Sequence, residues 1–299
     1  MIHKFEMNGV RLVLDVHSGA VHIIDELIWD LLDYGPNFPL NEVVSALKDK
    51  YKPEALEEGI KELRQLTESE MLYTSWNQED KPVMMGEPVI KAMCLHAAHD
   101  CNLRCSYCFA STGDFKGERG LLDLETGKKA LEFLIKHSGG RRNLEVDFFG
   151  GEPMMNFQVV KQLVEYGREL EKQYNKQFRF TITTNGLLLD DEALEYINRE
   201  FVNVVISIDG RPQVHDNLRK TKAGTGSYEH IVPKAVKLAQ SRNQMDYYAR
   251  GTFTKYNKDF DKDVIHLADL GFNQISVEPV VAPEEEEYHL SFEELPEIN

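Results

Sequence analysis

From residue 89 onward, short apolar runs alternate with longer helical patterns, and this alternation limits the possible folds more than any other feature. Six runs have the length of strands, and five helical segments separate them. Strands that are buried on both faces read as continuous apolar runs, and parallel strands need crossover helices between them. The sequence therefore predicts an α/β domain with a parallel sheet, either curled toward a barrel or doubly wound. The runs are VIKAMCLHAA, NLEVDFF, FRFTITT, NVVISI, YYARGTF and QISVEPVV.

The first segment, residues 1–76, has a different pattern. VRLVLDV and AVHIID alternate apolar with other residues around a short turn, which predicts a hairpin. Three helical patterns follow, at 25–35, 40–51 and 54–66, so we expect a small winged-helix-like domain. Its 7 basic and 14 acidic side chains disfavour DNA binding. An exposed strand edge beside a helix can instead accept a peptide as an added strand.

The remaining boundaries follow from composition. The polar residues 77–88 contain Pro and Gly and are predicted to be a linker, so the α/β domain spans 89–281. Residues 282–299 carry an acidic run and are predicted to be an acidic tail, or the start of a linker to a further domain. The net charge of -16, with 34 basic and 50 acidic residues, disfavours a nucleic-acid partner. No long apolar run or signal peptide is visible, so we expect a cytoplasmic protein without a membrane partner.

Unusual residues stand where the predicted strands end. The first strand is followed by a cysteine cluster, and the next three are followed by Gly150-Gly151-Glu152-Pro153, Thr184-Asn185-Gly186 and Ser207-Ile208-Asp209-Gly210. In both candidate architectures, functional residues collect in the loops after the carboxyl ends of the strands. These four segments are therefore predicted to converge on one rim of the sheet.

The cysteine cluster lies in HDCNLRCSYCF, residues 99–109, where three of the four cysteines fall at 101, 105 and 108. A zinc site would need a fourth ligand, which His96 or His99 could supply. An iron–sulfur cubane held by three thiolates would leave one iron open to a non-protein ligand. Tyr107 could then pack against a planar group bound beside the cluster, or simply pack in the protein. Cys94, within the first strand, is predicted to be a buried small apolar residue.

The pattern C-x3-C-x-aromatic-C after the first strand of a βα-repeat chain resembles the signature of radical S-adenosylmethionine (SAM) enzymes. The resemblance implies a [4Fe-4S] cluster on Cys101, Cys105 and Cys108, whose open iron binds the amino and carboxylate groups of SAM. Reduction of the cluster then cleaves SAM to methionine and a 5′-deoxyadenosyl radical that abstracts hydrogen. The family fold is a full or partial barrel, commonly with six strands. We therefore expect a partial (β/α)6 radical SAM barrel preceded by the small winged-helix-like peptide-recognition domain.

The other rim segments resemble cofactor-binding motifs of the same family. Gly150-Gly151-Glu152-Pro153 resembles its GGEP motif, which implies close backbone approach at the glycines and a methionine ammonium on Glu152. Ser207 and Asp209 resemble a pair that binds ribose or carboxylate, and Asn185 resembles another cofactor-facing residue. The alternative is that these residues only form turns. Asn, Asp and Ser are common in turns, and a Gly-Gly-Glu-Pro segment suits a tight turn from a strand into a helix.

The carboxylate of SAM also calls for a cation. Arg250 lies inside the apolar run of the fifth strand, where burial without a partner would be costly, and Arg219 in the loop after the fourth strand competes for the same role. We favour Arg250 slightly. If the barrel curls as the resemblance implies, Val277 and Glu278 at the end of the sixth strand lie near the adenine.

Over nearly its whole length the chain is similar to the maturases of SCIFF peptides (six cysteines in forty-five residues). The similarity implies that the first domain binds the leader of a cysteine-rich precursor peptide. It also implies an electron donor and a thioether (sactionine) bond between a cysteine sulfur and the α-carbon of a threonine. The similar stretches are LDVHSGAVHIIDE, CNLRCSYCFASTGDF, RRNLEVDFFGGEP, YARGTFTKYN and LADLGFNQISVEPVVA.

One departure from this family bears on activity. Its members continue into a cysteine-rich C-terminal (SPASM-type) domain with two auxiliary clusters, and this sequence has only Cys94 outside the cluster motif. We therefore expect a truncated chain that binds cluster, SAM and leader but makes little or no thioether. The alternatives are another radical SAM maturase, of the sulfatase or quinone-cofactor type, and a non-catalytic zinc-bearing peptide-binding module.

Overall fold

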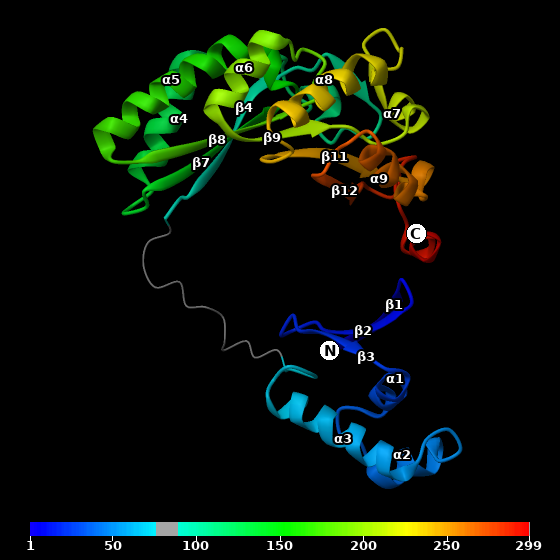
Figure 1. The fold of residues 1–299 in the computed structure, drawn as a ribbon. Helices are drawn as coiled ribbons and strands as arrows, with labels where there is room; N and C mark the ends of the chain where they lie inside the picture. The colour runs from blue at the N-terminus through cyan, green and yellow to red at the C-terminus, as the bar shows by residue number, and fades with distance from the viewer. Residues whose placement is uncertain (76–88, 299) are drawn as a thin grey trace. The chain divides into compact units, whose positions relative to one another are not determined.

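The computed structural model describes residues 1–75 and 89–298, and these form two compact units, one in each range (Figure 1). The predicted linker at 77–88 lies outside the described residues. Each unit has its own cluster of buried hydrophobic residues. The two units are therefore described separately.

The N-terminal unit is a three-stranded antiparallel sheet followed by three helices. Its strands are β1 (Ile2–Met7), β2 (Val10–Asp15) and β3 (Val21–Ile24), in the order β1-β2-β3. The predicted hairpin is confirmed as the β2–β3 pair, whereas β1 was not predicted, because polar residues fall on both of its faces. The helices are α1 (Glu26–Leu31), α2 (Leu40–Leu47) and α3 (Pro53–Glu68).

Local sequence explains where these helices begin. The carboxylate of Asp25 accepts the backbone N–H of Ile28 at 2.8 Å and so caps α1. Pro53 occupies the first turn of α3, where its missing N–H costs nothing. The apolar faces of the helices pack on one face of the sheet and form a core of Val13, Leu31, Leu32, Phe38, Val43, Leu56, Ile60, Leu63 and Leu72.

The second unit contains the predicted parallel α/β sheet. Its six parallel strands, β4 (Ala92–His99), β7 (Asn143–Gly150), β8 (Gln177–Thr184), β9 (Phe201–Ser207), β11 (Tyr247–Phe253) and β12 (Ile275–Pro279), lie side by side in chain order. A doubly wound sheet would reverse its strand order, and this one does not. The short β6 (Gly120–Leu121) pairs antiparallel with β4, so β6 and β12 are the two free edges. The unit is therefore a partial barrel.

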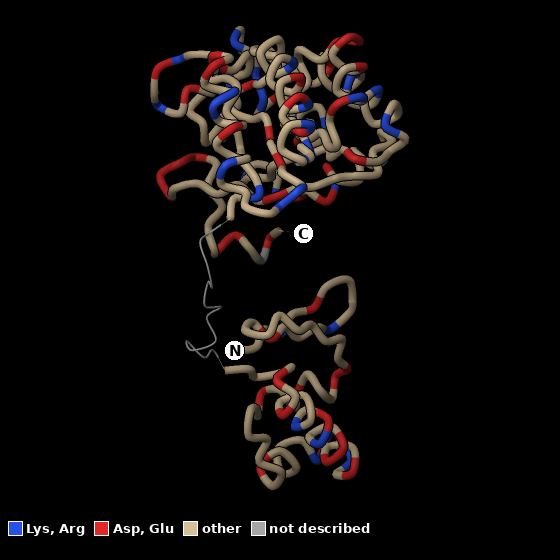
Figure 2. Tube along the Cα trace, turned by 90° about the vertical axis from the view of Figure 1, so that its left-hand side faces the viewer, with Lys and Arg blue, Asp and Glu red and all other residues tan. Residues whose placement is uncertain are grey.

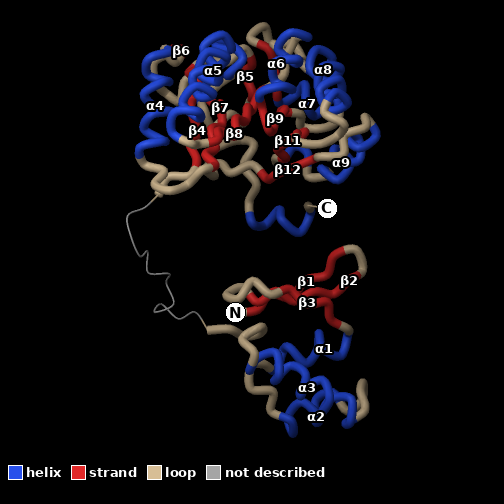
Figure 3. The backbone as a smooth tube through the Cα atoms, turned by 60° about the vertical axis from the view of Figure 1, so that its left-hand side comes forward, coloured by secondary structure: helices blue, strands red, loops and turns tan. Residues whose placement is uncertain are grey.

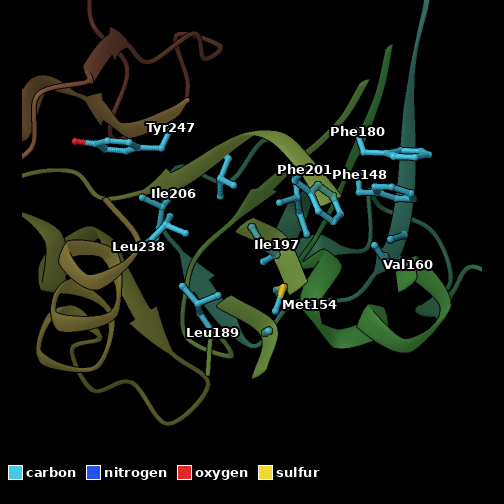
Figure 4. Packing of buried hydrophobic residues seen from close by; sticks show 14 of the residues in the cluster. Phe148, Met154, Val160, Phe180, Leu189, Ile197, Phe201, Ile206, Leu238 and Tyr247 are labelled. Atoms are coloured by element: carbon cyan, nitrogen blue, oxygen red, sulfur yellow. The ribbon is translucent and has the colours of Figure 1, made fainter. Parts of the chain in front are cut away.

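The crossover helices cover one face of this sheet (Figures 1 and 3). Large apolar side chains such as Phe148, Phe180 and Ile206 are fully buried between sheet and helices (Figure 4). The alternate residues, among them Asp147 and Thr181, point to the other face and are only partly buried. The helices are α4 (Leu124–Lys136), α5 (Phe157–Tyr174), α6 (Asp191–Glu200), α7 (Pro212–Leu218), α8 (Tyr228–Ser241) and α9 (Phe260–Asp269).

A second, two-stranded sheet was not predicted. In it, β5 (Leu103–Cys105), within the cysteine loop, pairs antiparallel with β10 (Arg219–Thr221), directly after α7. The register sets Cys105 opposite Arg219, and the N–H of Ser106 also donates to the carbonyl of Leu218 at 2.9 Å. The loop after β9 is thereby fixed to the cysteine loop.

Three observations concern the surface of the protein, namely the exposure of Cys94, the distribution of charge and the polarity of the helices. The predicted burial of Cys94 is wrong, because its side chain is exposed at the amino-terminal half of β4. Acidic and basic positions are interspersed over the helices of both units (Figure 2). Across residues 1–75 and 89–298, no helix is both long enough and apolar enough to cross a membrane.

Candidate functional site

The carboxyl ends of the parallel strands surround a cavity of about 390 Å³, large enough for a cofactor-sized ligand. The four rim segments predicted from the sequence do converge there. Of the predicted site residues, Asp209 and Val277 do not line the cavity, and the following twelve do: Cys101, Cys105, Tyr107, Cys108, Gly150, Gly151, Glu152, Asn185, Ser207, Arg219, Arg250 and Glu278.

The two glycines after β7 let the chain approach the cysteine loop. The N–H of Gly151 donates to the carbonyl of Ala98 at 2.8 Å, and the N–H of Glu152 donates to the carbonyl of Asp100 at 2.9 Å. A Cβ on Gly151 would lie 2.2 Å from the Asp100 oxygen, and one on Gly150 would lie 2.4 Å from the Ala98 oxygen. Close backbone approach is thus required at both positions, for Gly150 against the end of β4 and for Gly151 against Asp100 of the cysteine loop.

Glu152 is held in a fixed orientation by protein donors. Its carboxylate accepts the N–H of Met154 at 3.0 Å, the hydroxyl of Thr184 at 2.7 Å and the N–H of Asn185 at 2.8 Å. Burial raises the pKa of Glu152, and these three hydrogen bonds oppose that rise. The side chain is only 1% exposed but borders the cavity, so it presents a preorganised acceptor to a ligand.

Asn185 links this loop to the first cysteine. Its amide nitrogen Nδ2 donates to Oδ1 of Asn102 at 2.7 Å and lies 3.7 Å from Sγ of Cys101. The backbone N–H of Leu103 points at the same sulfur from 3.4 Å. Among the described residues, the buried Nδ2 of Asn102 has no hydrogen-bond acceptor. Two protein donors thus point toward the Cys101 sulfur, and they are the side-chain amide of Asn185 and the backbone N–H of Leu103.

The three cysteines of the loop are free thiols. Burial raises the pKa of Cys101 to about 11 and that of Cys105 to about 12, and the nearby Arg219 partly offsets the rise at Cys105. Binding a metal would therefore release protons from these thiols. Within residues 1–75 and 89–298, no group of three or more His, Cys, Asp or Glu side chains is placed to hold a metal ion.

Asp209 belongs to a buried network behind the cavity wall. Its two oxygens accept a bidentate pair from Arg219 at 2.9 and 3.0 Å, the hydroxyl of Tyr107 at 2.8 and 2.9 Å, and the N–H of Thr252 at 3.0 Å. The guanidinium of Arg219 also stands over the Tyr107 ring, 5.3 Å from its centroid. Asp209 is fully buried, so it holds Tyr107 and Arg219 in place and does not itself reach the cavity.

Arg250 is paired with a protein acid and is not buried. Its side chain is 47% exposed and lines the cavity, where its Nη2 pairs with Oε2 of Glu278 at 2.5 Å. The strands curl so that this position of β11 faces the open interior of the barrel. Glu278 lines the cavity as expected, together with the following Pro279, whereas the preceding Val277 does not.

Several lining residues were not predicted. Thr183 and Thr252 lie on the same strands as predicted residues, and strict two-residue alternation from Arg250 would have found Thr252. Phe109 and Phe149 form an aromatic wall, with ring centroids 6.2 Å apart. Phe109 is 73% exposed although it directly follows the last cysteine, and only this position in the cysteine motif marks it in the sequence.

Comparison with known proteins identifies the family. Residues 97–270, which include the end of β4, the cysteine loop and the next four parallel strands, match the Radical SAM superfamily. This chain belongs to the radical SAM superfamily. Membership implies a [4Fe-4S] cluster and SAM as cofactors. The three cavity-lining thiols, the donors around Cys101 and the unpaired Asn102 amide fit such a cluster.

Individual relatives extend the similarity beyond the shared region. The radical SAM cyclopropyl synthase TigE of Paramaledivibacter caminithermalis is 23% identical over 285 residues, which cover 86% of this chain and 57% of that protein. A cysteine-type anaerobic sulfatase-maturating enzyme of Clostridium novyi is 26% identical over 140 residues, covering 46% of this chain and 37% of that protein. This chain therefore spans little more than half of one relative and about a third of the other.

A solved structure shows the same fold. The chain described as "Native anSMEcpe with bound AdoMet and Cp18Cys peptide" superposes with a TM-score of 0.59 at 20% identity. The superposition covers 69% of this chain and 56% of that chain. The prediction of a radical SAM-like partial barrel is thereby confirmed, together with a small antiparallel β unit at the N-terminus.

Proposed function

We propose that this chain is the leader-binding and SAM-cleaving part of a peptide maturase that joins a cysteine sulfur to the α-carbon of a threonine. The observation that carries the proposal is the cavity itself, which combines three free thiols with the fixed carboxylate of Glu152 and the half-exposed Arg250. The similarity to TigE covers 86% of this chain and so reaches into the N-terminal unit, and the similarity to a sulfatase-maturating enzyme supports an enzyme that modifies a polypeptide.

In this proposal Cys101, Cys105 and Cys108 hold the cluster, and the lining residues orient SAM. Bound there, the reduced cluster supplies the electron that cleaves SAM and yields the radical that takes a hydrogen atom from the substrate. Glu152 accepts hydrogen bonds from the methionine ammonium, and Ser207 donates to an oxygen of the ligand. Arg250 releases Glu278 and binds the carboxylate of SAM. An ion pair between two half-exposed side chains contributes little free energy, so Glu278 is easily displaced.

The substrate is proposed to reach the cavity along the open face of the sheet. Below the cavity that face presents polar side chains, such as Asp147 and Thr181, rather than the bulky apolar layers that fill closed barrels. A peptide backbone needs such hydrogen-bonding partners.

Thioether formation requires three transfers. One hydrogen atom leaves the α-carbon and completes 5′-deoxyadenosine, and one proton leaves the thiol for the solvent. One electron passes to an external iron–sulfur acceptor.

The N-terminal unit is proposed to bind the leader by strand addition. Within the part of the chain that the structure describes, β3 pairs only with β2 and is an edge of the sheet, and two of its side chains, Val21 and Ile23, are 57% and 78% exposed. Unpaired N–H and C=O groups on such an edge can pair with an extended peptide while alternate side chains meet exposed apolar residues. Ile23→Pro should weaken leader binding without affecting SAM cleavage, because the register turns the N–H of His22 toward Val13 of β2 and that of Ile23 toward the free edge.

Anaerobic reconstitution tests the proposal. We expect about four irons and visible iron–sulfur absorption per chain, and 5′-deoxyadenosine after addition of SAM and a reductant. Zinc in a colourless protein, with no 5′-deoxyadenosine, would instead indicate the non-catalytic peptide-binding module. The control replaces all three cluster cysteines with alanine, which should abolish iron binding.

A panel of peptides then separates the peptide-maturase proposal from its alternatives. A precursor with a leader and a cysteine-rich core should bind the chain and change its hydrogen exchange at β3. A short sulfatase-type peptide without a leader should not. Turnover of the short peptide, with no leader binding, would favour the sulfatase-type maturase to which the Clostridium novyi similarity points.

A further inference from the structure

Arg219 is the buried cation nearest the cysteine loop, and its position is set by the backbone. It begins β10, whose pairing with β5 sets it opposite Cys105. The side chain is buried, and Nη1 lies 4.0 Å from the Cys105 sulfur. Nε and Nη2 are both used by Asp209, so Nη1 is left to face the sulfur.

A supporting layer locks this arrangement. The N–H of Asp209 donates to Nδ1 of the fully buried His215 at 3.4 Å, and Nε2 of that ring meets the hydroxyl of Ser227 at 3.0 Å. Ser227 in turn donates to the carbonyl of Arg219 at 2.6 Å. Both members of the ion pair are thus tied to α7 and the start of α8 by buried hydrogen bonds. Such rigid support is typical of groups that tune a metal centre through its ligands.

We propose that the Arg219–Asp209 pair sets the reduction potential of the iron–sulfur cluster through the sulfur of Cys105. Reduction adds a negative charge to the cluster, and hydrogen bonds and positive charge at a ligand sulfur stabilise the reduced state. Arg219 therefore raises the potential, and Asp209 lowers it by neutralising part of that charge. Tyr107, which lies between the cysteines and donates to Asp209, keeps the carboxylate turned toward Arg219 and away from the cavity.

The alternative role, in which the pair binds SAM directly, fits the contacts less well. Both oxygens of Asp209 are occupied and buried, and Arg219 has two of its three nitrogens committed to that carboxylate. The half-exposed Arg250 lines the same cavity and has only an exposed partner to release. The two arginines are therefore assigned different tasks, one toward the cluster and one toward SAM.

The test is an electron paramagnetic resonance titration of the reconstituted chain without SAM, which measures the midpoint potential and not turnover. Arg219→Gln should lower the ratio of reduced to oxidised cluster at least tenfold at a fixed potential, a shift of about 59 mV for one electron. Asp209→Asn should shift the potential the opposite way, and the double variant should fall between the two. Lys220→Gln is the matched control, because it removes an exposed charge from the next residue of β10 and should leave the potential unchanged.

Shifts of the midpoint potential in opposite directions distinguish electrostatic tuning from a merely structural role. A structural role would shift the potentials of both single variants in the same direction. Shifts of the same sign, or none larger than that of Lys220→Gln, would overturn the proposal. If Arg219→Gln binds no iron, the potential of Asp209→Asn must still exceed that of the double variant. If Asp209→Asn binds no iron, the midpoint potential of Arg219→Gln must lie below that of the wild type and below that of the double variant.

The proposal rests on the cluster-binding part of the proposed function, and their failures look different. A wild-type chain that binds no iron would refute both. A wild-type chain with a normal cluster and unchanged potentials in the variants would refute only the role of the Arg219–Asp209 pair. Iron and sulfide content and the melting temperature of each variant are measured before the titration.

Discussion

Replacing Gly151 with alanine should prevent cluster binding while leaving the fold of the barrel intact. The added Cβ would lie 2.2 Å from the carbonyl oxygen of Asp100, whereas ordinary contact begins at 3.4 Å. The neighbour is backbone and not a flexible side chain, so the chain itself must move by more than 1 Å. Asp100 directly precedes Cys101, and the displacement therefore moves the first ligand of the cluster.

The energetic cost can be worked from the two hydrogen bonds that join these loops. Moving the loops apart weakens the bond from Gly151 to Ala98 and that from Glu152 to Asp100. Losing two partly buried backbone bonds costs about 2 to 4 kcal/mol, less than the stability of a typical domain. The variant should therefore fold, with its local geometry changed.

Iron and sulfide per chain after anaerobic reconstitution measure the effect, and circular dichroism measures the fold. We expect native circular dichroism with less than a tenth of the wild-type iron content. Gly120→Ala is the control, because its Cβ would meet nothing within 4 Å although it lies on β6, beside the same strand β4. Full iron content in Gly151→Ala would show that the close approach of these loops does not organise the cluster site.

Three other substitutions test the N-terminal unit, the core and the cavity. Burial alone would raise the pKa of Asp15, but hydrogen bonds from the backbone N–H groups of Thr74, His17 and Ser18 hold it below its usual 3.8. Asp15→Asn should therefore lower the free energy of unfolding by about 2 kcal/mol at pH 7. The difference between wild type and variant should keep its full size above about pH 4 and should disappear as the pH falls through the lowered pKa of Asp15. Urea unfolding at several pH values measures it, and a pH-independent difference would contradict the assignment. Phe148→Ala should cost the barrel unit about 3 to 5 kcal/mol in the same assay, since the ring is fully buried, and a loss below about 1 kcal/mol would contradict that packing. Arg250→Gln should raise the dissociation constant of SAM roughly tenfold or more in calorimetry, whereas Glu278→Gln should not, and equal effects would argue against a carboxylate on Arg250.

Much of the barrel could be predicted from the sequence because its causes are local. A strand covered by helices on one face places an apolar residue at every second position, and the runs at 143–149 and 178–184 show this alternation. The carboxyl ends of parallel strands meet at one rim, so residues at those ends, such as Asn185 and Ser207, were expected near the cysteines. Chain order also brought the cysteine loop to that rim.

The partners of the charged residues could not be predicted in the same way. The place of Arg250 in an apolar run called for an acidic partner, but only the fold shows that Arg250 is half-exposed and that the partner is Glu278, 28 residues away. Cys94 was expected in the core, but it faces the open side of the same sheet. Periodicity shows which residues share a face, whereas only the curvature and the open edges decide whether that face is covered.

The sequence by itself determined which segments are strands, the rim on which the chemistry lies and the spacing of the cysteines that marks the family, whereas the structure decided that the strands lie side by side in chain order. The first three follow from covalent order and from the period of a strand. Only the tertiary structure decided that Tyr107 and Asp209, 102 residues apart, form one buried network, and that β10 sets Arg219 opposite Cys105. Such contacts depend on how distant segments pack, because a buried carboxylate must find its cation in space and no local pattern records where that cation lies.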